Sequence, residues 1–408
     1  MMKWEENLRG WLIRHALGLG YAAVALLGLF IRYSYLPLLA ADLEFMNSSW
    51  FEAIKAGGMA GVLDPALQYT YSPFHLYVWT LAAKLFGGFN TYTVLKAVSI
   101  IMEFLLCAAC FLLIRAILPE ARKRLGSFIG FTLIWLNPVL IWNAAGWGQT
   151  DASFAMLCVL AVLLLIRDKP VWALTSLGLA LAWKLQAILL LPLFLVAYFC
   201  GKKRFSALWF LLVPGILVAS GVPMMLIGQS PLFAVHIYAG QTDLYSQITY
   251  NCPNLFALMG DAIGNKQMIN GMFSRTGMVL CIAALGGMAV WMMVKRVRLT
   301  DRMAVLMGAW CVLCCVFFLP RMHERYGIVG EVLLLCWAVA VGKPRGFAYV
   351  LLGLLPTMSA YAEYMFRNPF FPLQLGGAMN MALLGLLTWE LLRETRGTEA
   401  VQAGVIEA

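Results

Sequence analysis

The stretch TVLKAVSIIMEFLLCAACFLLIRAI, residues 93–117, carries charge only at Lys96, Glu103 and Arg115. A helix rises about 1.5 Å per residue, so an apolar run of about 17 to 25 residues crosses the hydrocarbon core of a bilayer. Similar runs recur along the 408-residue chain, of which 62% is hydrophobic and 12% charged, against about 25% charged in a typical soluble domain. The runs are continuous rather than alternating, which predicts membrane-spanning helices and argues against a β-barrel.

About twelve such segments predict an all-α, polytopic membrane protein with a single membrane domain over residues 1–397. They are residues 12–33, 93–117, 126–146, 152–167, 171–184, 187–200, 206–228, 276–295, 303–319, 326–341, 346–361 and 376–392. No soluble domain or internal repeat interrupts them. Residues 398–408 are expected to form a short disordered tail.

The basic residues indicate how the chain is oriented in the membrane. With the N-terminus in the cytoplasm, 20 of the 30 lysines and arginines fall in cytoplasmic segments, as the positive-inside rule requires. Both termini are then cytoplasmic, and the longer polar loops lie on the outer face. This distribution also accounts for the net charge of +10, which therefore does not indicate nucleic-acid binding.

Residues 71–89 are apolar enough to form another span, but a crossing there would place every later basic loop on the outer face. We therefore expect an interfacial or re-entrant helix, because its tyrosine, tryptophan and histidine suit the headgroup region. Residues 34–92 then form a first outer loop with two amphipathic helices, and residues 229–275 form a second outer loop. His75, Lys84 and Lys96 are expected to be interfacial anchors.

Nine of the ten cysteines fall inside apolar runs. Cys107 and Cys110 have the C-x-x-C spacing of metal and redox motifs, but a zinc site needs a closed set of polar ligands. We therefore interpret the cysteines as small packing residues.

Polar residues gather where the predicted spans reach the outer face. Ionisable groups near membrane depth are costly, so each of them is a functional hypothesis. These residues lie in six segments, LAADLEFMNSSW, YSP, GWGQTD, AWKLQ, TDLYSQITYNCPN and PRMHERYG. The candidates are Asp42, Glu44, Trp50, Tyr71, Gln149, Asp151, Lys184, Gln186, Asp243, Tyr245, Gln247, Asn251, Asn254, Arg321, His323, Glu324, Arg325 and Tyr326. The cations among them predict an anion site, because guanidinium geometry matches phosphate.

Each group also has a structural interpretation. Asp42 and Glu44 would favour the N-terminus of an amphipathic helix through the helix dipole. Lys184 would extend its ammonium group to the membrane interface. A single histidine such as His323 is more often a structural residue than a ligand-binding one. Gln149 with Asp151 would bridge helices by hydrogen bonds, while Glu103 would face a cavity or pair with a basic residue.

The order of these motifs resembles the GT-C superfamily of multi-span glycosyltransferases. The motifs are D-x-E followed by tryptophan, Y-x-P before an amphipathic helix, W-G-Q-x-D, W-K-x-Q and a late H-E-x-Y, and they cover nearly the whole chain. The chain resembles in particular bacterial mannosyltransferases related to the GPI second mannosyltransferase. It is similar, more distantly, to the dolichyl-phosphate-glucose-dependent glucosyltransferases of N-glycan synthesis.

This resemblance implies a GT-C-like fold and a sugar donor carried on polyprenyl phosphate. The acceptor would be a glycan or glycolipid on the outer face of a bacterial cytoplasmic membrane, within cell-envelope synthesis. Asp42 matches the catalytic base and Glu44 a second acid. The donor phosphate is assigned to Arg321, His323, Arg325 and Lys184. The substrate pocket is assigned to Trp50, Tyr71, Gln149, Asp151, Gln186, Asn251, Asn254, Glu324 and Tyr326.

The chemistry of sugar transfer agrees with these residue types. An aspartate within hydrogen-bond reach activates the acceptor hydroxyl, and cations stabilise the charge that develops on the leaving phosphate. The expected reaction is a single inverting displacement with no cofactor or metal ion. The alternative is a divalent ion held by Asp42 and Glu44, as in metal-dependent members of the superfamily.

Two other functions remain open from the residues alone. A transporter or flippase of lipid-linked sugars would use the same cations to bind phosphate, although such proteins often contain paired repeats with broken helices at mid-membrane. A subunit that binds lipid without chemistry is the third hypothesis. The polar residues at the span ends favour the transferase.

Overall fold

The helices of the computed structural model coincide with the apolar segments of the sequence. The structure describes residues 2–244, 246–260 and 271–406, and 81% of the protein is helical. The first elements are α1 (Lys3–Tyr35), η1 (Asp42–Asn47), α2 (Ser48–Gly57), η2 (Gly58–Leu63), η3 (Pro65–Leu67), α3 (Pro73–Phe86), α4 (Thr91–Ile117), η4 (Glu120–Arg122), α5 (Lys123–Trp135), α6 (Pro138–Ile141), η5 (Trp142–Gly146), α7 (Asp151–Ile166) and α8 (Pro170–Trp183). The remaining elements are η6 (Leu185–Leu190), α9 (Leu191–Cys200), η7 (Ala207–Leu211), α10 (Leu212–Ser220), η8 (Val222–Ile227), α11 (Phe233–Leu244), β1 (Thr249–Tyr250), α12 (Leu255–Leu258), α13 (Met272–Val294), α14 (Asp301–Phe318), β2 (Met322–His323), α15 (Ile328–Val341), α16 (Pro344–Phe366) and α17 (Leu373–Ile406).

The all-α class and the polytopic membrane character are confirmed. Among the described residues, six helices are long and apolar enough to cross a membrane, and seven if the bent pair Glu120–Trp135 and Pro138–Gly146 is one span. That pair bends by 42°. The predicted number of twelve spans is not confirmed, because α7, α8 and α15 are apolar but have only 14 to 16 residues each.

Local sequence explains where several of these helices begin. Proline occupies the first turn of α3, α8 and α16, where its missing N–H needs no partner. Asn90 caps α4 and Thr300 caps α14 through side-chain oxygens that accept backbone N–H groups.

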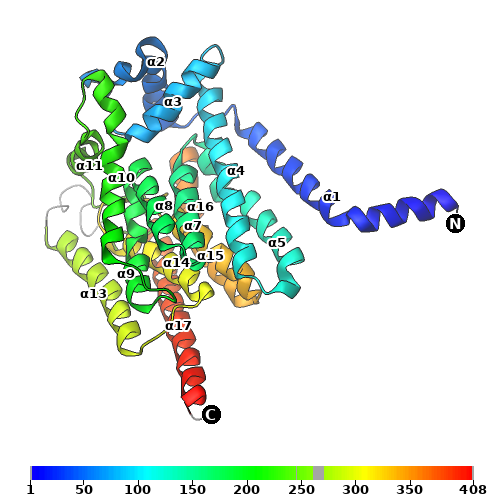
Figure 1. Cartoon of the computed structure of the whole chain (residues 1–408). Coiled ribbons are helices and arrows are strands. Elements are labelled where there is room, and N and C mark those ends of the chain that lie inside the picture. Colours follow the sequence, from blue (N-terminus) through cyan, green and yellow to red (C-terminus); the bar gives the residue numbers. More distant parts are fainter. Residues whose placement is uncertain (1, 245, 261–270, 407–408) are drawn as a thin grey trace.

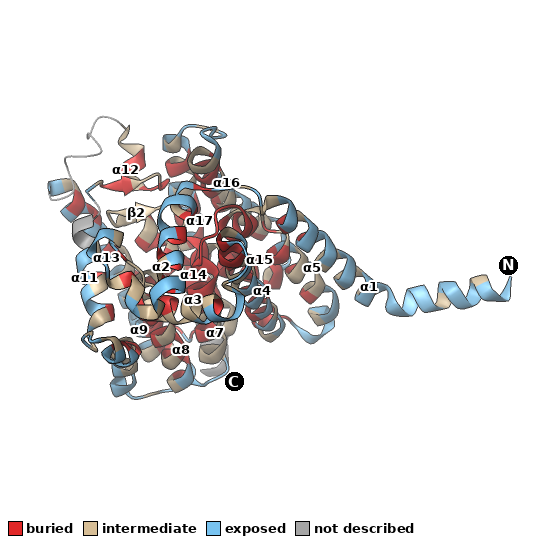
Figure 2. Ribbon diagram, turned by 90° about the horizontal axis from the view of Figure 1, so that it is seen from above, coloured by how far each residue is buried: buried red, intermediate tan, exposed pale blue. Residues whose placement is uncertain are grey.

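The short helices α7 and α15 form the centre of the bundle. Helix α7 packs against α4 and α8, and α15 packs against α14, α16 and α4. Figure 2 shows the buried residues concentrated in this centre, whereas α1 is mostly exposed and extends away from it. All ten cysteines are buried and none is in a disulfide, as expected of packing residues.

The first outer loop folds into a layer over one end of the bundle. Helices α2 and α3 lie together at the top of Figure 1, and the C-terminal end of α17 lies at the opposite end. Helix α3 has 14 residues, about 21 Å, which is shorter than the hydrocarbon core. Trp50 is buried between the two helices and donates its indole N–H to the Leu67 carbonyl at 2.7 Å.

Two buried charged groups hold α1 to the bundle. The guanidinium of Arg32 forms an ion pair with Glu103, donates to the Trp135 carbonyl at 2.8 Å and stacks on the Trp135 ring. Glu103 therefore pairs with a basic residue rather than facing a cavity. Lys96 donates to the Tyr35 carbonyl at the end of α1 and is fully buried. Its expected role as an interfacial anchor is therefore wrong, because the free carbonyls at the end of α1 bind the ammonium group.

The second outer loop pairs with the segment that follows α14. Strand β1 lies parallel to β2, with Thr249 opposite Met322 and Tyr250 opposite His323. Part of this predicted loop lies outside the described residues, namely Tyr245, residues 261–270 and the side chain of Asp243. The disordered tail stays a prediction, since α17 extends to Ile406 and residues 407–408 are not described.

Candidate active site

Five segments of the chain, two of them within the first outer loop, meet around one cavity. They enclose a cavity of about 490 Å³, within the range of roughly 300–1,000 Å³ that is typical of small-molecule sites. The cavity is lined by Asp42, Met46, Asn47, Trp50, Thr70, Tyr71, Gln247, Tyr250, Asn251, His323, Glu324, Arg325, Tyr364 and Arg367.

Asp42 begins the π-helix η1 and presents its carboxylate to this cavity. One carboxylate oxygen accepts a hydrogen bond from the Tyr364 hydroxyl at 2.6 Å, and the other accepts one from the Gln149 amide at 3.0 Å. The guanidinium of Arg325 lies 3.7 Å from the second oxygen. The side chain of Asp42 is 27% exposed, so it is held in place but remains accessible from the cavity.

A tight turn before α7 brings Gln149 to Asp42. Gly148 has φ of +75°, a conformation that residues with a Cβ rarely adopt. A Cβ at this position would also lie 3.1 Å from the side chain of Leu43, next to Asp42. The GWGQTD motif therefore needs its second glycine both for the turn and for close contact with the first outer loop.

Asp151 is the first residue of α7 and is completely buried. Its carboxylate forms an ion pair with Lys184 and accepts a hydrogen bond from the Asn143 amide at 2.9 Å. Lys184 stands at the break between α8 and η6. The guanidinium of Arg325 lies 3.8 Å from the same carboxylate.

Arg325 is the electrostatic centre of the site. Its guanidinium lies 3.1 Å from the Glu324 carboxylate and 4.8 Å from the centre of the Trp147 ring. Tyr364 also stacks on Trp147, with the two ring centres 4.1 Å apart. Burial raises the pKa of Glu324, while the positive charge of Arg325 opposes this shift.

His323 belongs to the short β2 strand and stacks on Tyr250 at 4.6 Å. Burial lowers the pKa of His323 well below its usual range, and the positive charges of Arg325 and Lys184 lower it further. The imidazole is therefore neutral near pH 7, and any contact with a phosphate would be a hydrogen bond rather than an ion pair.

An aromatic cluster forms the wall under the first outer loop. Tyr71 contacts Trp50 at 5.0 Å and His75 at 4.3 Å between ring centres. His75 is buried, so its expected place as an interfacial anchor is wrong. Burial, with a contribution from the positive charge of Lys184, lowers the pKa of His75 to about 3.

The expected site residues fall into three groups. Those that line the cavity are Asp42, Trp50, Tyr71, Asn251, His323, Glu324 and Arg325. Gln149, Asp151, Lys184 and Tyr326 stand directly behind this lining and contact it or one another. The others, Glu44, Arg321, Gln186 and Asn254, do not line the cavity, and their roles stay predictions.

Particular contacts explain two members of the last group. Asn254 caps the short helix α12 by accepting two backbone N–H groups. Arg321 has a positive φ of 63°, and its backbone N–H donates to Ile248 at 2.7 Å, which joins β2 to the second outer loop. Glu44 is exposed to solvent.

Four functional candidates were missed by sequence reasoning. Tyr364 and Arg367 lie at the end of α16, in a segment that is typical of an apolar span. Asn143 and Trp147 lie in η5 and the turn after it. Trp147 is part of the W-G-Q-x-D motif, so the motif itself was the available signal, whereas no local pattern points to the other three.

A family match covers part of this site. The family model of glycosyltransferase family 87 matches residues 69–320, more than half of the chain. The chain belongs to glycosyltransferase family 87. No curated protein matches the chain.

Family 87 consists of membrane glycosyltransferases of the GT-C type, so the expected superfamily and a transferase activity are confirmed in general terms. The specific relationship to mannosyltransferases is not confirmed. The matched residues include Gln149, Asp151 and Lys184, but Asp42 precedes them and Arg325 follows them. A sugar donor, an acceptor and membrane association follow from family membership.

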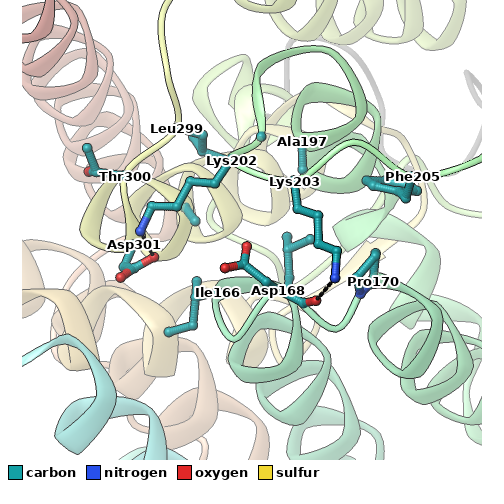
Figure 3. Close-up of a pocket in the computed structure, with 13 residues that line it drawn as sticks. Ile166, Asp168, Pro170, Ala197, Lys202, Lys203, Phe205, Leu299, Thr300 and Asp301 are labelled. Carbon is teal, nitrogen blue, oxygen red and sulfur yellow. Dashed lines mark hydrogen bonds and ion pairs between the residues drawn. The ribbon is translucent and has the colours of Figure 1, made fainter.

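Figure 3 shows a different cavity, which is too small to hold a sugar. Its volume is about 30 Å³, and it lies among Lys202, Lys203, Asp168 and Asp301. Helix α7 separates this cavity from the active site, because Asp151 begins the helix and Ile166 ends it, about 24 Å away. The cavity at Asp42 is therefore the candidate active site of this family 87 transferase.

Proposed function

We propose that this protein transfers a hexose from a polyprenyl-phosphate-linked sugar to an acceptor hydroxyl on the non-cytoplasmic face of a bacterial membrane. The observation that carries the proposal is the accessible carboxylate of Asp42, which lies in a sugar-sized cavity beside Arg325. A base and a cation within one cavity are what transfer from a phosphate ester requires.

Asp42 would act as the general base. Both of its oxygens accept hydrogen bonds from neutral donors, Tyr364 and Gln149, which orient the carboxylate without protonating it. The acceptor oxygen forms a bond to the anomeric carbon and gives its proton to Asp42. The bond from the anomeric carbon to the phosphate oxygen breaks, and its electron pair leaves with polyprenyl phosphate. One displacement of this kind inverts the anomeric centre.

The charge balance of the site suggests which cations hold the donor phosphate. Arg325 and Lys184 are already paired with Asp42, Asp151 and Glu324. Arg325 and Lys184 would therefore stabilise the negative charge that develops on the leaving phosphate. Arg367 lines the cavity with an exposed side chain and forms no ion pair within the described residues. We therefore assign Arg367 to binding the phosphate of the donor before the reaction.

The mechanism needs no metal ion, because a phosphate monoester leaves readily when cations surround it. Within the part of the chain that the structure describes, no three histidine, cysteine or acidic side chains gather in a way that could hold a metal ion. A metal requirement is tested directly by adding EDTA to the assay described below.

The basic residues support a site on the outer face. From Lys184 at the active site, the chain runs through η6 and α9 and then reaches Lys202, Lys203 and Arg204. Positive charge favours the cytoplasmic side, so the active site would face outward.

A transfer assay tests this function. Purified protein is incubated with synthetic polyprenyl-phosphate glucose or mannose, each radiolabelled in the sugar, and with lipid extract as the source of acceptor. We expect a labelled product with one of the two donors, formed equally well in the presence of EDTA. Tight binding of both donors without any product would contradict a transferase and favour a transporter of lipid-linked sugars.

A further inference from the structure

A second large cavity lies at the other end of the bundle, between the ends of α9 and α13. Its volume is about 880 Å³, and Lys202, Arg204, Arg296 and Arg298 contribute to its lining. None of these residues has a part in the sugar chemistry, and the family match assigns no function to them.

Chain geometry places this cavity one membrane thickness away from the active site. From Lys184 the chain runs through six residues of η6 and ten residues of α9 before it reaches the cavity at Cys200. At about 2.0 Å per residue for the 3₁₀ turn and about 1.5 Å for the α-helix, this path spans about 27 Å. The hydrocarbon core is about 30 Å thick, so the cavity lies at the opposite membrane surface.

The lysines and the arginines beside this cavity have different partners. Figure 3 shows Lys202 directed at Asp301 and Lys203 directed at the Asp168 carbonyl, at 2.7 and 3.4 Å. In contrast, no ion pair joins Arg204, Arg296 or Arg298 to a carboxylate anywhere in the described residues. Three guanidinium groups in one cavity repel each other, and a bound anion would remove that repulsion.

Exposed apolar side chains continue the cavity toward the membrane interior. Phe199 and Met293 line the cavity on α9 and α13, and Phe199 is 63% exposed. Val290, one turn before Met293 on α13 and farther from the basic loop, is 53% exposed. A ligand for this cavity would thus combine an anionic head with an apolar body that lies along the two helices.

We propose that this cavity binds the headgroup of an anionic phospholipid of the cytoplasmic leaflet. A guanidinium group can donate two parallel hydrogen bonds to two phosphate oxygens. Basic cavities at the cytoplasmic ends of helices are suited to anionic headgroups. The acyl chains lie against Phe199 and Val290. The proposal does not depend on the sugar chemistry at the other membrane surface.

A binding experiment on the full-length protein tests the proposal. The protein is purified in a neutral detergent and titrated with phosphatidylglycerol, phosphatidylcholine or inorganic phosphate, and lipid retention is measured by native mass spectrometry. We expect retention of phosphatidylglycerol alone. Each cation beside the bound headgroup contributes about fivefold to anionic lipid binding, so Arg204→Gln/Arg296→Gln/Arg298→Gln should weaken retention about 100-fold.

Two further variants complete the design. Arg9→Gln/Arg14→Gln/Arg124→Gln removes the same charge from exposed residues outside the cavity and should retain the lipid as wild type does. The charge-preserving variant Arg204→Lys/Arg296→Lys/Arg298→Lys should retain it within about tenfold. If the glutamine triple variant does not fold, the single variant Arg204→Gln in the loop after α9 gives the same comparison, with an expected loss of about fivefold.

Three outcomes would overturn the proposal. Equal losses in the cavity variant and in the control variant would mean that only the general charge of the surface attracts lipid. Equal retention of phosphatidylcholine would mean that headgroup charge is not recognised. Displacement of phosphatidylglycerol by millimolar inorganic phosphate would mean that the cavity is a site for free anions rather than for lipid.

Discussion

At the scale of single residues, the site is defined by the way in which Asp42 is held. Tyr364 and Gln149 each donate to one carboxylate oxygen, and they come from elements far apart in the sequence. A carboxylate held in this way keeps its orientation while the acceptor and the donor enter. A hydrogen bond to a charged group contributes about 1.5–3 kcal/mol, so each of these donors should matter measurably.

Tyr364→Phe removes one of these donors and keeps the stacked ring on Trp147. We expect the turnover number to fall about tenfold or more, with little change in donor affinity, because Tyr364 contacts the base. Steady-state transfer kinetics measure both quantities. Tyr33→Phe, at an exposed tyrosine of α1, is the matched control, and an unchanged turnover number in Tyr364→Phe would remove Tyr364 from the mechanism.

His75 makes a prediction about stability and pH. Its folded pKa of about 3 lies below the unfolded value of about 6.5, so below pH 6.5 the unfolded chain takes up a proton that the folded protein does not. The contribution of His75 to stability is thus present above pH 6.5 and is lost as the pH falls from 6.5 toward 3. At pH 5 the loss is about 2 kcal/mol relative to pH 7.

His75→Phe should remove this part of the acid sensitivity, because a phenyl ring fits the cluster of Tyr71 and Trp79 and does not titrate. Thermal unfolding at pH 7 and at pH 5 gives the difference for both proteins. An equal loss of stability in wild type and His75→Phe would contradict the buried neutral imidazole.

At the scale of elements, a single turn connects the two halves of the site. The W-G-Q-x-D segment carries Gln149 to Asp42 and Asp151 to Lys184, and Gly148 makes both contacts possible through its positive φ. Motifs of this kind can be predicted from sequence, since each is a short segment whose residues act together.

Gly148→Ala should disturb this turn. A left-handed conformation costs a residue with a Cβ about 1–2 kcal/mol, and the new methyl group would press on Leu43 next to Asp42. We expect lower stability by that amount and slower sugar transfer, measured by thermal unfolding and by the transfer assay. Gly10→Ala, in an open part of α1, should cost nothing, and equal behaviour of the two variants would contradict the close contact.

The end of α16 shows why part of the site could not be predicted. The segment SAYAEYMF is typical of the last turns of an apolar helix, and nothing within it indicates that Tyr364 contacts a residue more than 300 positions earlier. Arg367 follows it as the C-cap residue of the helix, where basic residues are common because they complement the helix dipole. Only the tertiary packing of α16 reveals their place in the cavity.

At the scale of the whole molecule, hydropathy predicts where helices form better than it predicts how many cross the membrane. Every predicted apolar segment contains a helix, yet α7, α8 and α15 are short and lie in the protein interior. A helix surrounded by other helices need not match the bilayer thickness, so its apolar character reflects burial in protein as well as contact with lipid.

The buried pair Arg32–Glu103 ties α1 to the rest of the molecule. Removing one partner leaves an uncompensated buried charge, which costs about 3–5 kcal/mol. Arg32→Met should therefore destabilise the protein strongly, and Arg32→Met/Glu103→Met should recover most of the loss. Thermal unfolding of wild type, both single variants and the double variant measures this coupling, and additive effects would contradict a direct ion pair.

The central claim is that Asp42 is the base of a sugar transfer, and Asp42→Asn tests it most directly. Single-turnover transfer and donor binding are measured for wild type, Asp42→Asn and the control Asp64→Asn, whose exposed side chain only caps η3. General-base catalysis contributes about 10²–10⁴-fold, so the transfer rate of Asp42→Asn should fall by that factor while donor affinity and the control stay near wild type. Transfer by Asp42→Asn at the wild-type rate would contradict the assignment of Asp42 as the base.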